Sequence, residues 1–246
     1  MKIITIATQK GGAGKTSSAA AIAQAAAFRG LRSILIDTDA QASAGLIYGA
    51  DTSKAGIYEL LTGKRASVQH TSAGDIITPG RTIELFKAPN DAAGNRLLYI
   101  ALQQISGLYD VCCIDTAPGL SAMLIQAIAA ADSVLIPAGA DSLGLSGLTQ
   151  ITDTIKAVKR VCKQDSPEIT GVFITKRNDR ATLKRQYADL LKKECAALGI
   201  PFANTGIPEA VALQEAQALR KSLFEYAPDS KPAKAYLKLI DELKLF

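Results

Sequence analysis

Residues 9–16 of the chain read Gln-Lys-Gly-Gly-Ala-Gly-Lys-Thr (QKGGAGKT). A short apolar run at residues 3–8 precedes this stretch and an alanine-rich run at residues 15–29 follows it, which predicts a strand, a glycine loop and a helix in that order. Glycines leave backbone N–H groups free to turn inward and approach phosphate oxygens, and the N-terminus of the following helix adds partial positive charge. The stretch therefore predicts a phosphate-binding loop.

Two lysines flank the glycines of this loop. Lys15 is placed to neutralise the β- and γ-phosphates of a nucleoside triphosphate, and the Thr16 hydroxyl to hold Mg²⁺. The general pattern G-x-x-x-x-G-K-[ST] is not met, because Gln9 stands where the first glycine belongs. Lys10 instead brings a second cation to the triphosphate. We expect ATP or ADP and Mg²⁺ as cofactors, and the phosphate-loop residues that bind them are Gly11, Gly12, Ala13, Gly14, Lys15, Thr16 and Ser17.

Acidic residues follow or end two of the predicted strands. Asp37 ends the run at residues 33–37, with Asp39 just beyond it, and Asp115 ends the run at residues 110–115. Carboxylates that face a bound triphosphate can hold Mg²⁺ through water or orient an attacking water. Acids at strand ends also serve as helix caps or turn formers, but the offset of these from the glycine loop favours a functional role.

The rest of the chain alternates short apolar runs with longer amphipathic or alanine-rich runs. Strands are predicted at residues 3–8, 33–37, 83–88, 110–115, 133–138 and 169–175, and helices at residues 15–29, 92–106, 120–130, 145–162 and 181–198. Continuously apolar strands are typical of a parallel sheet with helices on both faces. We expect an α/β fold with a single doubly wound, mostly parallel sheet, and one domain over residues 1–246.

Composition excludes several other classes of protein. Aromatic residues make up 5% of the 246 residues and tryptophan is absent, which disfavours a stacking platform for single-stranded nucleic acid. The four cysteines include no C-x-x-C pair, and Cys112 and Cys113 should face opposite sides of a strand. The single histidine, His70, lies in a polar stretch and is expected at the surface. No signal peptide or transmembrane run is evident, so we expect a cytoplasmic protein.

Positive charge is concentrated in one short segment. Residues 1–150 hold 11 basic and 11 acidic residues, whereas residues 151–246 hold 17 and 12, which accounts for the net charge of +5. Residues 176–193 alone hold seven basic residues against two acidic ones, a surplus as large as that of the whole chain. Such a segment is either a solvated surface or a site for the DNA backbone.

The predicted helix at residues 181–198 carries much of this charge. Its large apolar residues at helical spacing should face the sheet; they are Leu183, Tyr187, Leu190, Leu191 and Leu198. That orientation would turn four basic side chains outward together as candidates for DNA binding; they are Lys184, Arg185, Lys192 and Lys193.

The pattern K-G-G-x-G-K-T at residues 10–16 resembles the deviant Walker A box of the ParA/MinD family of P-loop ATPases. Residues 37–41 resemble the family's D-x-D-P-Q pattern, with Ala40 in place of proline, and residues 115–119 resemble its D-x-x-P-G switch loop. Further similarity to the C-terminal portion of partition ParA proteins lies at residues 205–208, 212–216 and 222–228. The resemblance spans nearly the whole chain and is weakest over residues 45–105.

This resemblance implies roles for individual residues. Lys10 would reach across a nucleotide-sandwich dimer to the partner's phosphates, and Asp39 would position the hydrolytic water, so that Lys10, Lys15 and Asp39 act in catalysis. Asp37 and Asp115 would lie near Mg²⁺ together with Thr16. The loop after the predicted strand at residues 169–175 and the segment near Pro208 would contact adenine. The candidates there are Arg177, Asn178 and Pro208.

The resemblance also implies a function. A ParA-type partition ATPase forms a homodimer on Mg-ATP, coats nucleoid DNA non-specifically, and is stimulated to hydrolyse ATP by a ParB-like centromere-binding adaptor. A second possibility is a related ATPase that positions a protein cargo on the nucleoid. A third is a MinD-like ATPase on a membrane, but the nearly balanced charges of residues 233–246 favour a helix docked on the body over a membrane anchor. A metal-cluster carrier would need differently placed cysteines.

Overall fold

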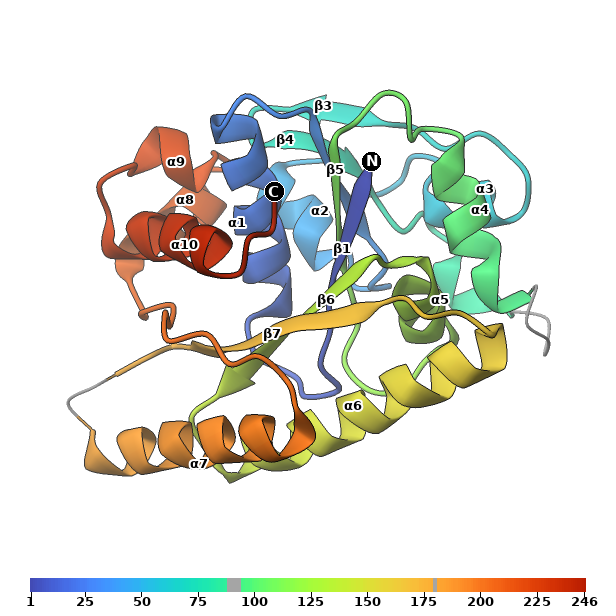
Figure 1. Cartoon of the computed structure of the whole chain (residues 1–246). Coiled ribbons are helices and arrows are strands. Elements are labelled where there is room, and N and C mark those ends of the chain that lie inside the picture. The colour runs from blue at the N-terminus through green and yellow to red at the C-terminus, as the bar shows by residue number, and fades with distance from the viewer. Residues whose placement is uncertain (88–93, 179–180) are drawn as a thin grey trace.

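The computed structural model describes residues 1–87, 94–178 and 181–246. Their strands form one seven-stranded sheet in the order β3-β4-β2-β5-β1-β6-β7 (Figure 1). The strands are β1 Lys2–Ile6, β2 Ser33–Asp37, β3 Gln69–Thr71, β4 Gly74–Ile77, β5 Val111–Asp115, β6 Ser133–Gly139 and β7 Glu168–Thr175. Every neighbouring pair is parallel except β3 and β4. The predicted doubly wound, mostly parallel sheet is confirmed.

Helices cover both faces of this sheet (Figure 1). They are α1 Lys15–Phe28, α2 Ser43–Tyr48, α3 Ile57–Leu61, α4 Leu97–Gln103, α5 Ala122–Ala130, α6 Ser142–Cys162, α7 Thr182–Leu198, α8 Val211–Ala218, α9 Leu223–Tyr226 and α10 Lys231–Glu242. Alternate strand residues pack on opposite faces: Ile4 and Cys113 lie in the core with α1 and α10, while Ile3 and Cys112 lie in the core with α4 and α5. The two adjacent cysteines therefore face opposite sides, as predicted.

The segment of weakest resemblance is also where the predicted elements are wrong. In the predicted strand at residues 83–88, Ile83–Leu85 form a 3-10 turn, and residue 88 lies outside the described residues. Ile83 is buried whereas Leu85 is 67% exposed, so this run packs on one side only and joins no sheet. In this part of the chain the strand that joins the sheet is β4, which pairs with β2 on the side opposite β5. It contributes only Ile76 and Ile77 to the core.

The remaining departures concern shorter elements. The predicted helix at residues 92–106 begins outside the described residues; its α-helical part is α4, preceded by a 3-10 turn at Gly94–Arg96. The short helices α2 and α3 and the hairpin of β3 and β4 were not predicted. These elements have only a few apolar residues each, so their sequence periodicity is too short to recognise. His70 lies on β3 with its side chain exposed, and its ring nitrogen contacts Asp75 at 2.7 Å, as a surface residue would.

The C-terminal helix α10 is docked on the body of the protein. Tyr236, Leu239 and Ile240 are buried against the face of the sheet that α1 covers, and the Tyr236 hydroxyl lies 3.1 Å from the Ser18 hydroxyl. At the end of the chain, Arg29 of the α1 C-cap forms an ion pair with Asp241. The prediction of a docked helix is confirmed. None of the helices in the described part of the chain has the length and apolarity needed to cross a bilayer.

Replacing Ile240 with alanine tests this docking. Because Ile240 is fully buried, Ile240→Ala is expected to lower the free energy of unfolding by ~2–4 kcal/mol through lost burial and a residual cavity. The measurement is urea denaturation followed by circular dichroism. The control, Lys238→Ala, changes an exposed residue of the same helix and should lie within ~0.5 kcal/mol of the wild type. Equal stability of the two variants would mean that α10 is not docked in solution.

Candidate functional site

The glycine loop lies between β1 and α1 at the carboxyl end of the central strands. Gly12 and Gly14 have φ values of 69° and 83°, in the left-handed region that residues with a Cβ seldom adopt. Gly14 is the N-cap of α1 and leaves its first turn without a side-chain cap. The backbone N–H groups of that turn therefore have no side-chain acceptor from the cap, and they form a site for an anion.

The loop forms the floor of an open cavity of about 380 Å³. The lining residues are Gly11, Gly12, Ala13, Gly14, Lys15, Thr16, Ser17, Asp39, Ser43, Thr116, Pro118 and Lys176. The structure thus brings Asp39 and the predicted switch loop to the phosphate loop. Lys176 and Ser43 were not predicted as site residues. Lys176 could have been, since it directly follows a predicted strand; Ser43 begins a helix that the sequence did not reveal.

Lys15 is held inside the loop. Its side chain is buried and its ammonium donates a hydrogen bond to the Lys10 carbonyl oxygen at 3.0 Å. Burial lowers its pKa, while the negative charges of Asp115 and Asp39 act in the opposite direction. A buried cation that is hydrogen-bonded to a loop carbonyl is well placed to exchange that bond for one to a phosphate oxygen.

Two fully buried carboxylates lie side by side below the loop. Asp37 ends β2 and Asp115 ends β5, and the two residues are register partners. Asp37 accepts hydrogen bonds from the backbone N–H groups of Asp39 and Gly45 at 3.0 and 2.9 Å. Neither carboxylate oxygen of Asp115 has a hydrogen-bond partner. Burial raises the pKa of both of these carboxyl groups. The charge of Asp39 adds to the increase for Asp37. For Asp115 the charges of Asp37 and Asp39 add to it, while the Thr16 hydroxyl and the Lys15 ammonium lower the pKa.

This donor set fits a magnesium ion that is shared with a phosphate ligand. Hard divalent cations prefer carboxylate and hydroxyl oxygens, and the unsatisfied oxygens of Asp115 lie at the end of the strand next to the loop that carries Thr16. Across the described ranges, no three acidic, histidine or cysteine side chains converge to hold a metal by themselves. A magnesium ion here would therefore take its other ligands from phosphate oxygens and water.

Asp39 has two roles in the structure. Its carboxylate accepts a hydrogen bond from the Gln41 backbone N–H at 3.0 Å and so stabilises the turn after β2. It also lines the phosphate-loop cavity and a second cavity of about 270 Å³ next to the switch loop. The switch loop is tied to the phosphate loop by the Gly119 backbone N–H, which donates to the Gln9 carbonyl at 2.8 Å. Asp39 therefore lies where phosphate loop and switch loop meet.

Lys10 points away from the loop that it belongs to. Its ammonium contacts both carboxylate oxygens of Asp141 at 2.7 and 2.8 Å. Asp141 is also the N-cap of α6 and accepts a hydrogen bond from the Gly144 backbone N–H. The lysine predicted to act on a partner's nucleotide is thus held by an acid of its own protomer.

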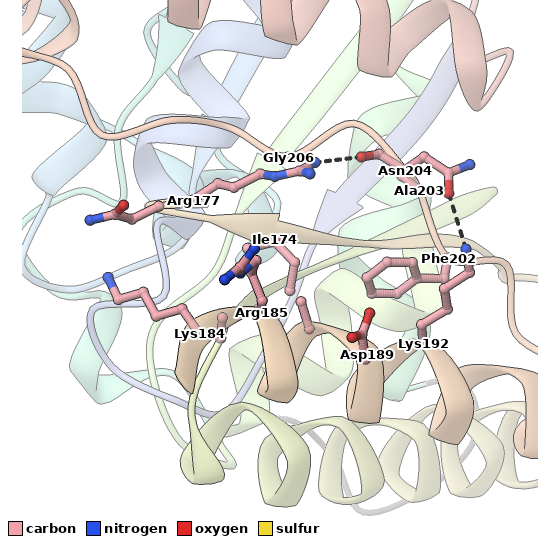
Figure 2. Close-up of a pocket in the computed structure, with 13 residues that line it drawn as sticks. Ile174, Arg177, Lys184, Arg185, Asp189, Lys192, Phe202, Ala203, Asn204 and Gly206 are labelled. Atoms are coloured by element: carbon pink, nitrogen blue, oxygen red, sulfur yellow. Dashed lines mark hydrogen bonds between the residues drawn. The ribbon is translucent and has the colours of Figure 1, made fainter. Parts of the chain in front are cut away.

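None of the three predicted adenine contacts lines the phosphate-loop cavity. Arg177 and Pro208 are neighbours, because the Arg177 N–H donates to the Ile207 carbonyl at 2.9 Å and a parallel bridge links Arg177 to Pro208. The Arg177 guanidinium, however, donates to the Asn204 carbonyl at 2.6 Å. Its side chain and Asn178 line a different cavity (Figure 2).

This cavity, the basic groove, lies between α7 and residues 202–206 and has a volume of about 310 Å³. Three of the four DNA-binding candidates, Lys184, Arg185 and Lys192, line it. Lys193 is exposed but does not line it. The apolar part of its lining includes Ile174 and Phe202.

The orientation of α7 agrees with the prediction only in part: Leu191 and Leu198 pack inward as expected. Leu183 and Leu190, expected to face the sheet, are 63% and 46% exposed. The inward face is built around Leu191 and Cys195, with Ala188 partly buried. Small residues supply the rest of this inward face, so a search for large apolar side chains identified only part of it. Of the cluster predicted to face outward, Arg185, Lys192 and Lys193 are exposed and Lys184 is half-buried. Lys184, Arg185 and Lys192 border the groove.

Comparison with known proteins places these features in context. Residues 1–167 match a family model described as an AAA domain. The chain is 32% identical to the chromosome-partitioning ATPase Soj of Thermus thermophilus, over 98% of this chain and 94% of that protein. It is also 32% identical to the chromosome partitioning protein ParA of Caulobacter vibrioides, over 99% and 94%. The ATP complex of a Cyanothece McdA variant superposes with a TM-score of 0.83 at 21% identity, over 99% and 96%, which shows a shared fold.

Asp115→Asn tests the unsatisfied carboxylate in the nucleotide-free protein. The folded-state pKa of Asp115 lies above its ordinary value of 3.8, so the carboxyl group destabilises the fold increasingly as pH rises above about 4. Asparagine has no charge to desolvate, and at pH 8 we expect ~1–3 kcal/mol of added stability, with a smaller gain at pH 5. Thermal denaturation of the variant and the wild type at both pH values measures this difference in stability.

The matched control is Asp37→Asn on the neighbouring strand. Both carboxylate oxygens of Asp37 accept backbone N–H bonds, and the amide keeps only one acceptor oxygen, so its stability gain should be smaller or absent. A lower melting temperature for Asp115→Asn than for the wild type at pH 8 would contradict the assignment of an unsatisfied buried charge.

Proposed function

This chain belongs to the family of ParA- and Soj-type chromosome-partitioning ATPases, and we propose that it binds ATP with Mg²⁺ and hydrolyses it to ADP and phosphate. The observation that carries the proposal is the buried, unsatisfied carboxylate of Asp115 beneath a glycine loop that also contains the buried cation Lys15. We take residues 1–246 as one ATPase domain, because α8, α9 and α10 pack in the same core as α1.

Different residues of the phosphate loop bind different parts of the triphosphate in this proposal. The N–H groups of residues 11–17 bind phosphate oxygens, and Lys15 exchanges its hydrogen bond with the Lys10 carbonyl for the β- and γ-phosphates. Thr16, Asp37 and Asp115 would hold magnesium, directly or through water, and the ion would supply positive charge against the phosphate charge that develops in the reaction. Lys176 and Ser43 line the same cavity and are further candidates for binding the nucleotide.

Hydrolysis requires a water molecule in line with the γ-phosphate, and Asp39 is the residue that we propose positions it. The Asp39 carboxylate lines the phosphate-loop cavity but is also committed to the turn at Gln41. We therefore expect slow hydrolysis by the protein alone and stimulation by a ParB-like centromere-binding adaptor that changes the orientation of this carboxylate. Release of DNA after hydrolysis would let the protein move its cargo over the nucleoid.

Dimerisation depends on Lys10 in this proposal. In one protomer without a partner, Lys10 is bound by Asp141. Two protomers that meet face to face on ATP would exchange this ion pair for an interaction between Lys10 and the partner's triphosphate, which carries more charge than one carboxylate. The exchange is favourable only when the third phosphate is present, so ATP and not ADP joins the protomers.

Sizing the protein with each nucleotide tests this role. Wild type with Mg-ATP should elute at twice the mass found with Mg-ADP, as measured by light scattering after gel filtration. Lys10→Ala should stay monomeric with both nucleotides because the charge acting in trans is missing. Calorimetry should still detect Mg-ATP binding to Lys10→Ala, since Lys15 is intact. A Lys10→Ala dimer as stable as that of the wild type would show that the interface does not use this lysine.

The basic groove is our proposed site for non-specific DNA. Lys184, Arg185 and Lys192 are directed to one cavity and can neutralise backbone phosphates without reading the base sequence. A dimer presents two grooves, and simultaneous engagement of both strengthens retention on the same DNA. A membrane surface is less well supported, because the apolar residues of α10 are already buried against the body. We therefore propose a DNA-associated role on the nucleoid in the cytoplasm.

Adjacent lysines provide the test of this site. Lys192→Glu reverses a charge inside the groove, and DNA affinity in the presence of ATP should fall about tenfold, with the salt slope reduced by ~0.9 for each backbone phosphate that a groove no longer neutralises. Lys193→Glu makes the same change outside the groove and should cost less than about threefold. Fluorescence anisotropy of a labelled duplex over a salt series gives both quantities. Equal losses of affinity in the two variants would argue that DNA does not bind in the groove.

A further inference from the structure

The basic groove contains one acidic side chain among its cations. Its charged lining residues are Arg177, Lys184, Arg185, Asp189 and Lys192. Figure 2 shows the Asp189 carboxylate on the α7 side of the groove, directed toward the opening between Arg185 and Lys192. Asp189 is four residues after Arg185 and three before Lys192 on α7, so the three side chains lie on one face of the helix.

Asp189 does not serve as an ion-pair partner for these cations. Within the described ranges, none of the ion pairs includes it. The Lys192 ammonium instead donates to the Asn204 side-chain oxygen at 3.3 Å, and Arg177 donates to the Asn204 carbonyl. Asn204 is fixed in turn by Glu242, which accepts from the Asn204 backbone N–H at 2.6 Å. Lys192 and Arg177, on the two walls, thus both donate to Asn204, and Arg185 donates to the Thr182 hydroxyl at 3.4 Å.

An acid that makes no structural ion pair still acts on whatever enters the groove. A phosphate that binds to Lys192 or Arg185 comes close to the Asp189 carboxylate, and two negative charges repel each other. At a solvent-exposed site one charge–charge interaction changes affinity by a factor of about two to five. This repulsion reduces the binding free energy once for a single protomer and twice for a dimer that binds DNA in both grooves.

We propose that Asp189 weakens phosphate binding in each groove, so that a single protomer dissociates from DNA more readily than it would with the cations alone. The inference rests on the proposed function, which supplies both the DNA ligand and the dimer. With the cations alone, each protomer would bind DNA about threefold more tightly in the absence of ATP. The added acid keeps binding by one groove weak, while two grooves acting together still retain the dimer on DNA.

The test is the neutral variant Asp189→Asn, measured by anisotropy with a labelled duplex of random sequence. Without nucleotide, the variant should bind about threefold more tightly than the wild type, and with Mg-ATP about tenfold more tightly, because two grooves contribute. Its salt slope should equal that of the wild type, since removal of an acid neutralises no further phosphate. Asp189→Lys should steepen the slope by ~0.9 per groove, because it adds a cation that neutralises one.

Glu194→Gln is the matched control. Glu194 lies on the same helix and the substitution removes the same charge, but the residue does not line the groove. Its affinity should stay within a factor of about 1.5 of the wild type. Circular dichroism confirms that all variants are folded before they are compared.

The outcomes separate the inference from the function on which it rests. If wild type with Mg-ATP shows no salt-sensitive DNA binding, the proposed DNA function itself is wrong. If the wild type binds and Lys192→Glu weakens binding, but Asp189→Asn matches the wild type, the DNA function holds and the inference about Asp189 is overturned. Equal tightening by Asp189→Asn and Glu194→Gln would also overturn it, because the effect would then be one of net charge alone.

Discussion

The charges buried at the carboxyl ends of β2 and β5 constrain everything built around them. Asp37 and Asp115 are register partners on adjacent parallel strands, so their carboxylates cannot separate without disrupting the sheet. The Lys15 ammonium offsets part of the negative charge of Asp115. A pair of buried carboxylates lowers the stability of the protein when no ligand is bound. A divalent cation supplies the positive charge that the pair lacks, and a phosphate chain supplies further oxygen ligands for the cation. The carboxylate oxygens of Asp115, which have no hydrogen-bond partner, therefore indicate which ligand the site accepts.

The loops around this site are connected in a way that suits a nucleotide-dependent switch. The Thr38 hydroxyl donates to the Asp115 carbonyl and the Thr116 hydroxyl to the Ile6 carbonyl, which ties three strand ends together. The switch loop is fastened to the phosphate loop through Gly119. Lys10 belongs to the phosphate loop yet is held by the cap of α6. Movement of the loop on phosphate binding would therefore be transmitted to the face that carries Lys10 and Asp141.

The basic groove is bordered by a helix that also packs in the core. One side of α7 is buried through Leu191 and Cys195, and the adjacent side carries the cations that border the groove. Residues 202–206 form the opposite wall, held along β7 by the bridge between Val172 and Phe202. Because β7 also leads to Lys176 in the phosphate-loop cavity, the groove and the candidate nucleotide site share one structural support.

The sequence by itself determined the glycine loop, the order of the central strands along the chain and the acids at their ends. Each of these is a local pattern: glycines that permit left-handed backbone, runs of apolar residues, and carboxylates at fixed offsets from them. Predictions over residues 45–105 were wrong or incomplete, because β3, β4, α2 and α3 are too short to have a recognisable period. Their positions depend on pairing with β2 and on packing over it.

Only the tertiary structure decided which distant side chains meet. It placed Asp141 against Lys10, directed Arg177 to Asn204, and brought Lys192 but not Lys193 into the groove. Sequence spacing could not settle the rotation of α7, because Ala188 and Cys195 bury as well as leucine when the neighbouring surface fits them. Partners of charged side chains are chosen by the geometry of surfaces that come together from different parts of the chain, and no local pattern of residues records that geometry.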